Sequence, residues 1–118
     1  MRFVKKNRVI TGKNAGAYPP AECVARIIAE YRGRLQDIPF DFHELVGALA
    51  PRHVLIIAPL KDSNFRAASV DRVAAAAHEV FKLHGHADRL RLEHPDCDHD
   101  FPKEMRQQAY ELFDHVMR

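Results

Sequence analysis

The sequence predicts an α/β fold in which parallel strands alternate with helices. Three stretches carry this prediction: an unbroken apolar run at residues 53–58, a long helical pattern at 69–85 and an alternating run at 89–93. An apolar run of strand length without alternation is typical of a strand covered on both faces. The order strand, helix, strand, helix is that of a βαβα unit with neighbouring parallel strands. We therefore expect two or three parallel strands flanked by about four helices.

Length and charge predict one domain with a basic N-terminal arm. The chain has 118 residues, of which 47% are hydrophobic and 29% charged, as in ordinary globular domains. Residues 1–20 carry five Lys or Arg and no acid. We expect residues 1–20 to be a poorly ordered arm, or to hold a single strand at 3–11, and residues 21–118 to form the domain. A solvated terminus is favoured over a nucleic-acid site.

No targeting or cofactor motif stands out. The chain has no apolar signal-peptide region and no run long enough to span a bilayer, so a cytoplasmic protein without a membrane partner is expected. Gly12-Lys13 lacks the glycine spacing and the Ser/Thr of a phosphate loop, and we expect no cofactor. Cys23 and Cys97 form no C-x-x-C pair and are interpreted as free thiols.

Two helices are expected before the apolar run. The first begins at Ala21 and stops at Gly33, and the second lies between Pro39 and Pro51. Each has apolar residues at the spacing of one helical face: Val24, Ile27, Ile28 and Tyr31 in the first, and Phe42, Leu45, Val46 and Leu49 in the second.

The third helix has recognisable ends. Ser69 is its expected N-cap and Gly85 its expected C′ residue. Its apolar face consists of Val70, Val73, Ala74, Ala77 and Phe81. The strand that follows, at residues 89–93, alternates leucines with charges, so one of its faces should be wet and it should lie near the edge of the sheet.

The last helix follows a proline. Pro102 is expected at the first helical position, with Asp100 close to the free N–H groups. The expected apolar face consists of Met105, Ala109, Leu112, Phe113 and Val116.

Both polar loops leave the carboxyl ends of the strands, where open α/β sheets place their sites. One loop offers Asp62 and the other His99. Neighbouring strands lie about 5 Å apart, so we expect the two side chains within hydrogen-bonding range. A carboxylate that accepts the Nδ1–H of a histidine leaves Nε2 to act as a general base. This is the acid–base half of a nucleophilic triad, in the chain order of the α/β hydrolases.

Three segments together resemble the C-terminal part of an α/β hydrolase. They are residues 38–52, which precede the acid-bearing strand, residues 58–65 as the acid loop, and residues 94–102 as the histidine loop. The resemblance is to the dienelactone-hydrolase-like, acetyl-xylan-esterase-like and prolyl-oligopeptidase-like enzymes, and it covers about residues 26–118. It implies a partial α/β-hydrolase fold, with Asp62 as the triad acid and His99 as the triad base. In a complete enzyme, the resemblance implies hydrolysis of a small carboxylic ester or peptide substrate.

Two features depart from that family. Asp98 stands where a glycine usually precedes the catalytic histidine, and no G-x-S-x-G elbow occurs in the sequence. Ser63, Ser69 and Cys97 lack the glycines of an elbow. We therefore expect a truncated or split gene product, inactive alone, because the nucleophile, base and oxyanion hole act as a unit.

Purely structural roles for some of these residues remain alternatives. Asp62 could be a plain loop or helix-capping aspartate, and Asp71 is a weaker alternative acid that more naturally sits exposed in the first turn of its helix. His94 precedes a proline at a strand end and is interpreted as structural.

Two alternatives come from other functional classes. A metal site could draw on His84, His86, His94, Asp96, Cys97, Asp98 and His99, although neither H-E-x-x-H nor paired C-x-x-C spacing is present. An interaction module would use the apolar strand at 53–58, whose inner edge stays unpaired unless residues 3–11 cover it. Its partner would be a second copy or a missing N-terminal half.

Overall fold

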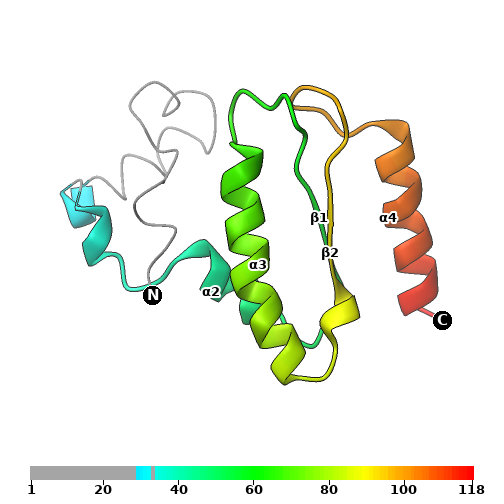
Figure 1. Cartoon of the computed structure of the whole chain (residues 1–118), viewed down its shortest axis with the longest axis horizontal. Coiled ribbons are helices and arrows are strands. Elements are labelled where there is room, and N and C mark those ends of the chain that lie inside the picture. Colours follow the sequence, from blue (N-terminus) through cyan, green and yellow to red (C-terminus); the bar gives the residue numbers. More distant parts are fainter. Residues whose placement is uncertain (1–28, 33) are drawn as a thin grey trace.

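The computed structural model describes residues 29–32 and 34–118 (Figure 1). The strand expected at 3–11 and most of the first helix lie outside the described residues. The described end of that helix, residues 29–31, passes into a turn at Arg32, which has a positive φ of 49°.

Two short strands form a parallel sheet in the described part of the chain. Strand β1 (Val54–Ile57) pairs with β2 (Leu90–Glu93), with Val54 opposite Leu90 and Ile57 opposite Glu93. The prediction of neighbouring parallel strands is therefore confirmed. The pairing continues one step further, because the N–H of Ala58 donates to the carbonyl of Glu93 at 2.9 Å.

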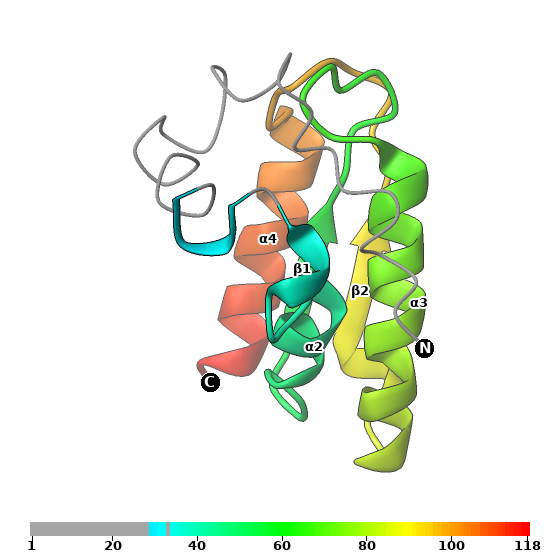
Figure 2. The same cartoon turned by 90° about the vertical axis from the view of Figure 1, so that its left-hand side faces the viewer.

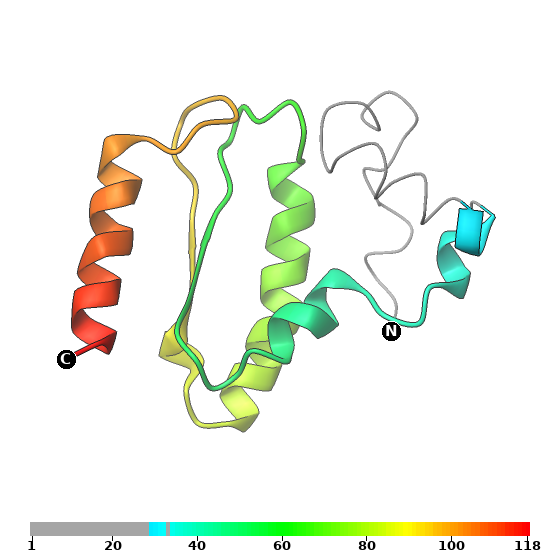
Figure 3. The same ribbon diagram turned by 180° about the vertical axis from the view of Figure 1, so that it is seen from behind.

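The elements make three layers. Helix α3 (Ala67–Leu83) lies on one face of the sheet and α4 (Lys103–Val116) on the other (Figures 1 and 3). Helix α2 (Phe42–Gly47) packs against α3, on the same side of the sheet. Two single turns of 3-10 helix complete the described elements: η2 (Leu35–Asp37), and η3 (Ala87–Arg89) just before β2. Among the described residues, no helix is long and apolar enough to cross a membrane.

The core lies between α3 and the sheet. Phe81 and Ala77 are fully buried on α3 and pack with Leu90 of β2. Partly buried side chains close around them: Val46, Ala50, Val54 and Ile56. The helical spacing that predicted Ala77 and Phe81 on the inner face is thus confirmed.

Helix α2 buries a different surface from the one its apolar spacing predicted. Asp41 caps its start in a capping box with Glu44, whose carboxylate accepts the N–H of Asp41 at 2.6 Å. The expected face is largely wrong, because Phe42, Leu45 and Leu49 are about half exposed. The buried residue is Gly47, whose missing Cβ lets α2 approach Val80 of α3 closely.

The start of α3 differs from its prediction, and its end does not. The helix begins two residues before Ser69, with Arg66 as N-cap, so Ser69 is not the cap. Instead the Ser69 hydroxyl accepts a hydrogen bond from the Arg72 guanidinium at 2.9 Å. Gly85 follows the C-cap with φ 74°, as predicted for a C′ glycine.

Helix α4 lies lightly on its face of the sheet. Pro102 is its N-cap, one position earlier than predicted, and Asp100 accepts the N–H of Phe101 rather than an N–H of the helix. No residue of α4 is buried, and Phe113 and Val116 of the expected apolar face are about half exposed. The helical spacing identified a face of α4 that the described residues cover only in part.

Candidate active site

The acid loop folds around Asp62. It follows β1, and the Asp62 carboxylate turns back on its own chain: Oδ1 accepts the N–H of Asn64 at 2.7 Å and that of Phe65 at 3.1 Å. Such an Asx turn lets an aspartate shape the loop that carries it. The Asp62 side chain is only 5% exposed. The loop therefore fixes the carboxylate on the inside of the turn.

The histidine loop runs beside the acid loop and is bonded to it. The N–H of Leu60 donates to the carbonyl of Pro95 at 3.0 Å, and that of Lys61 donates to the carbonyl of Cys97 at 3.1 Å. The Lys61 ammonium also pairs with Asp96 at 2.9 Å. The two loops thus continue the parallel pairing beyond the ends of the strands.

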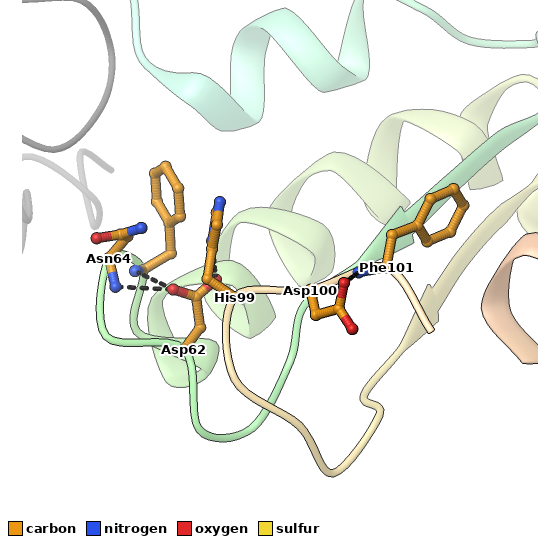
Figure 4. Close-up of polar contacts among 6 residues, drawn as sticks. Asp62, Asn64, His99, Asp100 and Phe101 are labelled. Atoms are coloured by element: carbon orange, nitrogen blue, oxygen red, sulfur yellow. Dashed lines mark hydrogen bonds and ion pairs between the residues drawn. The ribbon is translucent and has the colours of Figure 1, made fainter. Parts of the chain in front are cut away.

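Asp62 and His99 meet where the loops lie side by side. Oδ2 of Asp62 lies 2.8 Å from Nδ1 of His99 (Figure 4). A carboxylate can only accept at this contact, so Nδ1 carries the proton. Nε2 of His99 hydrogen bonds to no described residue, and the side chain is 51% exposed. The contact fixes the tautomer that leaves Nε2 available as a base.

Opposing effects act on the pKa of Asp62. Burial raises the pKa of the carboxyl. Hydrogen bonds from His99 and from the backbone of Asn64 and Phe65 together lower it by more than burial raises it. The net result is a pKa below the ordinary value of 3.8. At neutral pH Asp62 is therefore an anion, which can stabilise an imidazolium at His99.

A hollow of about 440 Å³ opens next to this pair. The ring of Phe65 lies 5.9 Å from the ring of His99 at a tilt of 30° and forms part of the wall. Apart from Asp62, His99 and Asp100 the lining is apolar: Ile56, Ile57, Ala58, Pro59, Phe65, Val70 and Phe101. The hollow can take an uncharged group beside the imidazole.

Comparison with known proteins identifies the family. A family model described as glucuronyl esterase, fungi, matches residues 13–85, more than half of the chain. The chain belongs to the fungal glucuronyl esterase family. No curated protein and no solved structure matches it.

The family match supports part of the resemblance described from the sequence. Fungal glucuronyl esterases are serine esterases of the α/β-hydrolase type, so the resemblance to α/β hydrolases is confirmed at that level. The narrower assignment to dienelactone-hydrolase-like, acetyl-xylan-esterase-like or prolyl-oligopeptidase-like enzymes stays a prediction. The match includes Asp62 and ends before His99. The assignment of His99 therefore depends on its contact with Asp62 and not on the family match.

A glucuronyl esterase of this type needs a nucleophile, and the serines and cysteine in the described residues are poor candidates. Ser63 is exposed without a hydrogen bond to His99, and the Ser69 hydroxyl accepts from Arg72. Cys97 is a free thiol. Desolvation and then the neighbouring carboxylates, Asp100 foremost, raise the pKa of Cys97. It is therefore protonated, and poorly nucleophilic, at neutral pH.

Asp71, the alternative acid, contacts a different histidine. Asp71 does not join Asp62 and His99; its Oδ1 lies 2.8 Å from Nε2 of His94. This second Asp–His pair was not predicted from the sequence. The signal was available, since the start of α3 and the end of β2 both lie at the edge of the sheet that carries the two loops.

The proposed metal ligands do not gather. Within residues 29–32 and 34–118 no three His, Cys, Asp or Glu side chains are placed to hold one ion. His84 and His86 follow α3, at the end of the sheet opposite the histidine loop. The metal alternative therefore gains no support from the arrangement.

Proposed function

We propose that this chain supplies the acid and the general base of a carboxylic ester hydrolase. Asp62 holds the imidazole of His99 by its Nδ1–H, and Nε2 takes the proton from an attacking hydroxyl and returns it to the leaving alcohol. The observation that supports this is the 2.8 Å contact between His99 and the buried Asp62. Family membership supports an ester as the substrate.

The substrate class follows from the family name and the site together. A glucuronyl ester joins an uncharged uronate ester group to an alcohol, and both sides of the bond are neutral before cleavage. The hollow beside His99 is lined by apolar side chains and by carboxylates, with no Lys or Arg. Such a lining suits a neutral ester and disfavours an anionic one, because carboxylates repel a negative ligand.

The nucleophile, in this proposal, comes from another segment. None of the 118 residues forms a G-x-S-x-G elbow. A base without a nucleophile and oxyanion hole retains little acyl-transfer activity, since these parts act together. We propose that the chain alone does not hydrolyse esters and that a missing N-terminal half supplies the elbow.

The edge of β1 is the natural place for that half. In the described part of the chain β1 pairs only with β2, so its other edge presents free N–H and C=O groups. Figure 2 shows α2 in front of β1, with α4 beside it. Both helices carry half-exposed apolar side chains, among them Leu45, Tyr110 and Phe113. A strand added at this edge would pair with the free N–H and C=O groups of β1. The alternative is that a second copy of the chain pairs with this edge of β1.

A serine-hydrolase phosphonate probe tests the chain alone. We expect no labelling of Ser63 or Ser69, and no hydrolysis of a p-nitrophenyl ester above the rate with heat-unfolded chain. Labelling at either serine, located by peptide mass spectrometry, contradicts the proposal that the nucleophile lies elsewhere.

Complementation tests the roles of Asp62 and His99. The chain is mixed with an N-terminal segment of a fungal glucuronyl esterase that carries the nucleophile, and hydrolysis of a methyl glucuronate ester is followed. His99→Ala should lower any restored rate by roughly 10²–10⁴-fold, and Asp62→Asn should also lower it. His84→Ala, an exposed histidine at the opposite end of the sheet, is the matched control. A His99→Ala mixture as active as the unsubstituted one refutes the proposed base.

The unpaired edge also favours a second candidate, a non-catalytic interaction module. Light scattering of the purified chain separates the cases: association through β1 predicts a species larger than a monomer. Leu45→Lys together with Phe113→Lys should then shift it toward monomer. A monomer at every concentration before substitution counts against this candidate.

A further inference from the structure

His94 makes two hydrogen bonds at the start of the histidine loop. Its Nδ1 lies 2.7 Å from the carbonyl oxygen of Ala58, and its Nε2 lies 2.8 Å from Oδ1 of Asp71. The side chain is 27% exposed and that of Asp71 is 54% exposed. His94 therefore sits between the end of β1 and the second turn of α3, partly shielded from water.

These contacts determine the protonation state of His94. A carbonyl oxygen has no hydrogen to donate, and a carboxylate oxygen has none either. Each ring nitrogen must therefore carry a proton for both contacts to exist. An imidazole with both nitrogens protonated is the cation. When it loses a proton, the neutral ring can keep only one of the two contacts.

The contacts join three elements next to the site. Ala58 directly follows β1 and leads into the acid loop, Asp71 belongs to α3, and His94 stands five residues before His99. The loop from Pro95 to His99 is tied at this end by His94. At its other end it is tied by the contact of His99 with Asp62.

We propose that His94 is a positioning residue that fixes the histidine loop, and through it His99, only while its ring is cationic. The hydrogen bonds to Ala58 and Asp71 are complete at lower pH, and one of them is lost as the pH rises. The assignment of His99 as the base belongs to the proposed function; the pH-dependent contact does not depend on it.

The charges around His94 favour the cation. Asp71 faces it from α3, and Glu93 stands next to it at the end of β2, where it also lies 3.3 Å from Arg91. Just after β1, the carbonyl of Ala58 accepts a hydrogen bond from the ring. That hydrogen bond raises the pKa of His94 most, burial lowers it, and Asp71 and Glu93 raise it again. The net pKa is raised above 6.5.

The direction of the pH effect follows from this. A raised pKa in the folded chain means that folding favours the protonated ring. The stabilisation is fully present below the unfolded value of 6.5 and is lost as the pH rises through the higher folded value. The loop should therefore loosen as the pH rises through the folded pKa of His94, which lies above 6.5.

Nuclear magnetic resonance of the full ¹⁵N-labelled chain tests the proposal without an activity assay. Two-bond ¹H–¹⁵N spectra of the histidine rings distinguish a cation from either neutral tautomer. At pH 6 we expect both His94 nitrogens to be protonated, with a titration midpoint above 6.5. Asp71→Asn should lower that midpoint. Glu79→Gln, which removes an exposed carboxylate from the same helix, should leave it unchanged.

Hydrogen exchange tests whether the contact holds the loop. The amides of Leu60 and Lys61 donate to carbonyls of the histidine loop, so their protection reports its attachment. After correction for intrinsic rates, protection should fall several-fold above the His94 midpoint. It should fall likewise at pH 6 in Asp71→Ala, which removes the partner of Nε2, but not in Glu79→Gln.

Three results would overturn the proposal. The first is a neutral His94 ring at pH 6, the second an unchanged midpoint in Asp71→Asn, and the third unchanged protection of Leu60 and Lys61. None of these results bears on whether His99 acts as a base, which complementation measures separately. Far-UV circular dichroism of each variant establishes that it is folded.

Discussion

Asp62 and His99 are hydrogen bonded at 2.8 Å, yet their side chains differ tenfold in exposure, 5% against 51%. The carboxylate belongs to the framework of the acid loop, since three donors converge on it. The imidazole reaches the surface beside the apolar hollow. A base must be open to its substrate, whereas the group that orients it must be held still. The difference in exposure suits these two roles.

Asp62→Asn should destabilise the fold in a pH-dependent way. The amide keeps one acceptor but loses the charge that strengthens three hydrogen bonds, which predicts a loss of about 1–3 kcal/mol at pH 7. Because the folded pKa of Asp62 is lowered, its contribution is present above 3.8 and is lost as the pH falls through the folded value. Urea unfolding of both chains should therefore give curves that converge toward acid pH.

Asp88→Asn is the matched control for that series. Asp88 is an exposed aspartate in η3, away from the acid loop. Its removal should change the unfolding free energy by less than about 0.5 kcal/mol at either pH. A constant difference between Asp62→Asn and the unsubstituted chain down to acid pH would contradict the role of the carboxylate charge.

Phe81→Ala should remove most of the stability of the described fold. The ring is fully buried between α3 and the sheet. Such a truncation costs about 3–5 kcal/mol, a large share of the stability of a small domain. Leu83→Ala, two residues along the same helix but 87% exposed, should cost less than about 0.5 kcal/mol. Thermal unfolding compares the two, and similar losses would place the core elsewhere.

Gly85→Ala should destabilise the end of α3 through its backbone. Gly85 has φ 74°, and nothing lies within 4 Å of a Cβ added there. The cost is therefore conformational, about 1 kcal/mol. Gly85→Asn should cost less, because asparagine tolerates this conformation better. Equal losses for both variants in urea unfolding would point to a contact instead of strain.

Gly47→Ala tests the close approach of α2 to α3. A Cβ at this position would lie 3.1 Å from a methyl group of Val80. Alanine raises helix propensity by up to about 1 kcal/mol, and the tight contact opposes this gain. In a Val80→Ala background the methyl group that would crowd the new Cβ is absent. Gly47→Ala should then be more favourable than in the unsubstituted chain, which a double-mutant cycle measures. Additive effects of the two substitutions would show that the Val80 side chain moves away from the new Cβ at no measurable cost in free energy.

Periodicity in the sequence was sufficient for the parallel pair and for the meeting of Asp62 with His99. Strand order and the rule that loops meet at one sheet edge depend only on local patterns along the chain. The same rule places His94 and Asp71 at one edge of the sheet. Their contact also requires the His94 ring to lie between the carbonyl of Ala58 and the Asp71 carboxylate. Spacing alone does not specify that orientation of the ring.

The exposed faces of α2 and α4 mark another limit of periodicity. The spacing of Leu45 and Leu49, or of Phe113 and Val116, shows that these residues share a side of a helix. It does not show whether anything covers that side. In α2 the close contact was made by Gly47, a residue that hydrophobic patterns do not count.

The side-by-side course of the two loops sets a rule for their lengths. The strands pair residues 36 positions apart in the chain, Ala58 and His94 keep that spacing, and Asp62 and His99 lie 37 apart. Deleting one residue from either loop would slide Asp62 past His99. Deleting one from each would keep them opposite. Homologous chains should therefore gain or lose residues in these two loops together, so that insertions in one are matched by insertions in the other.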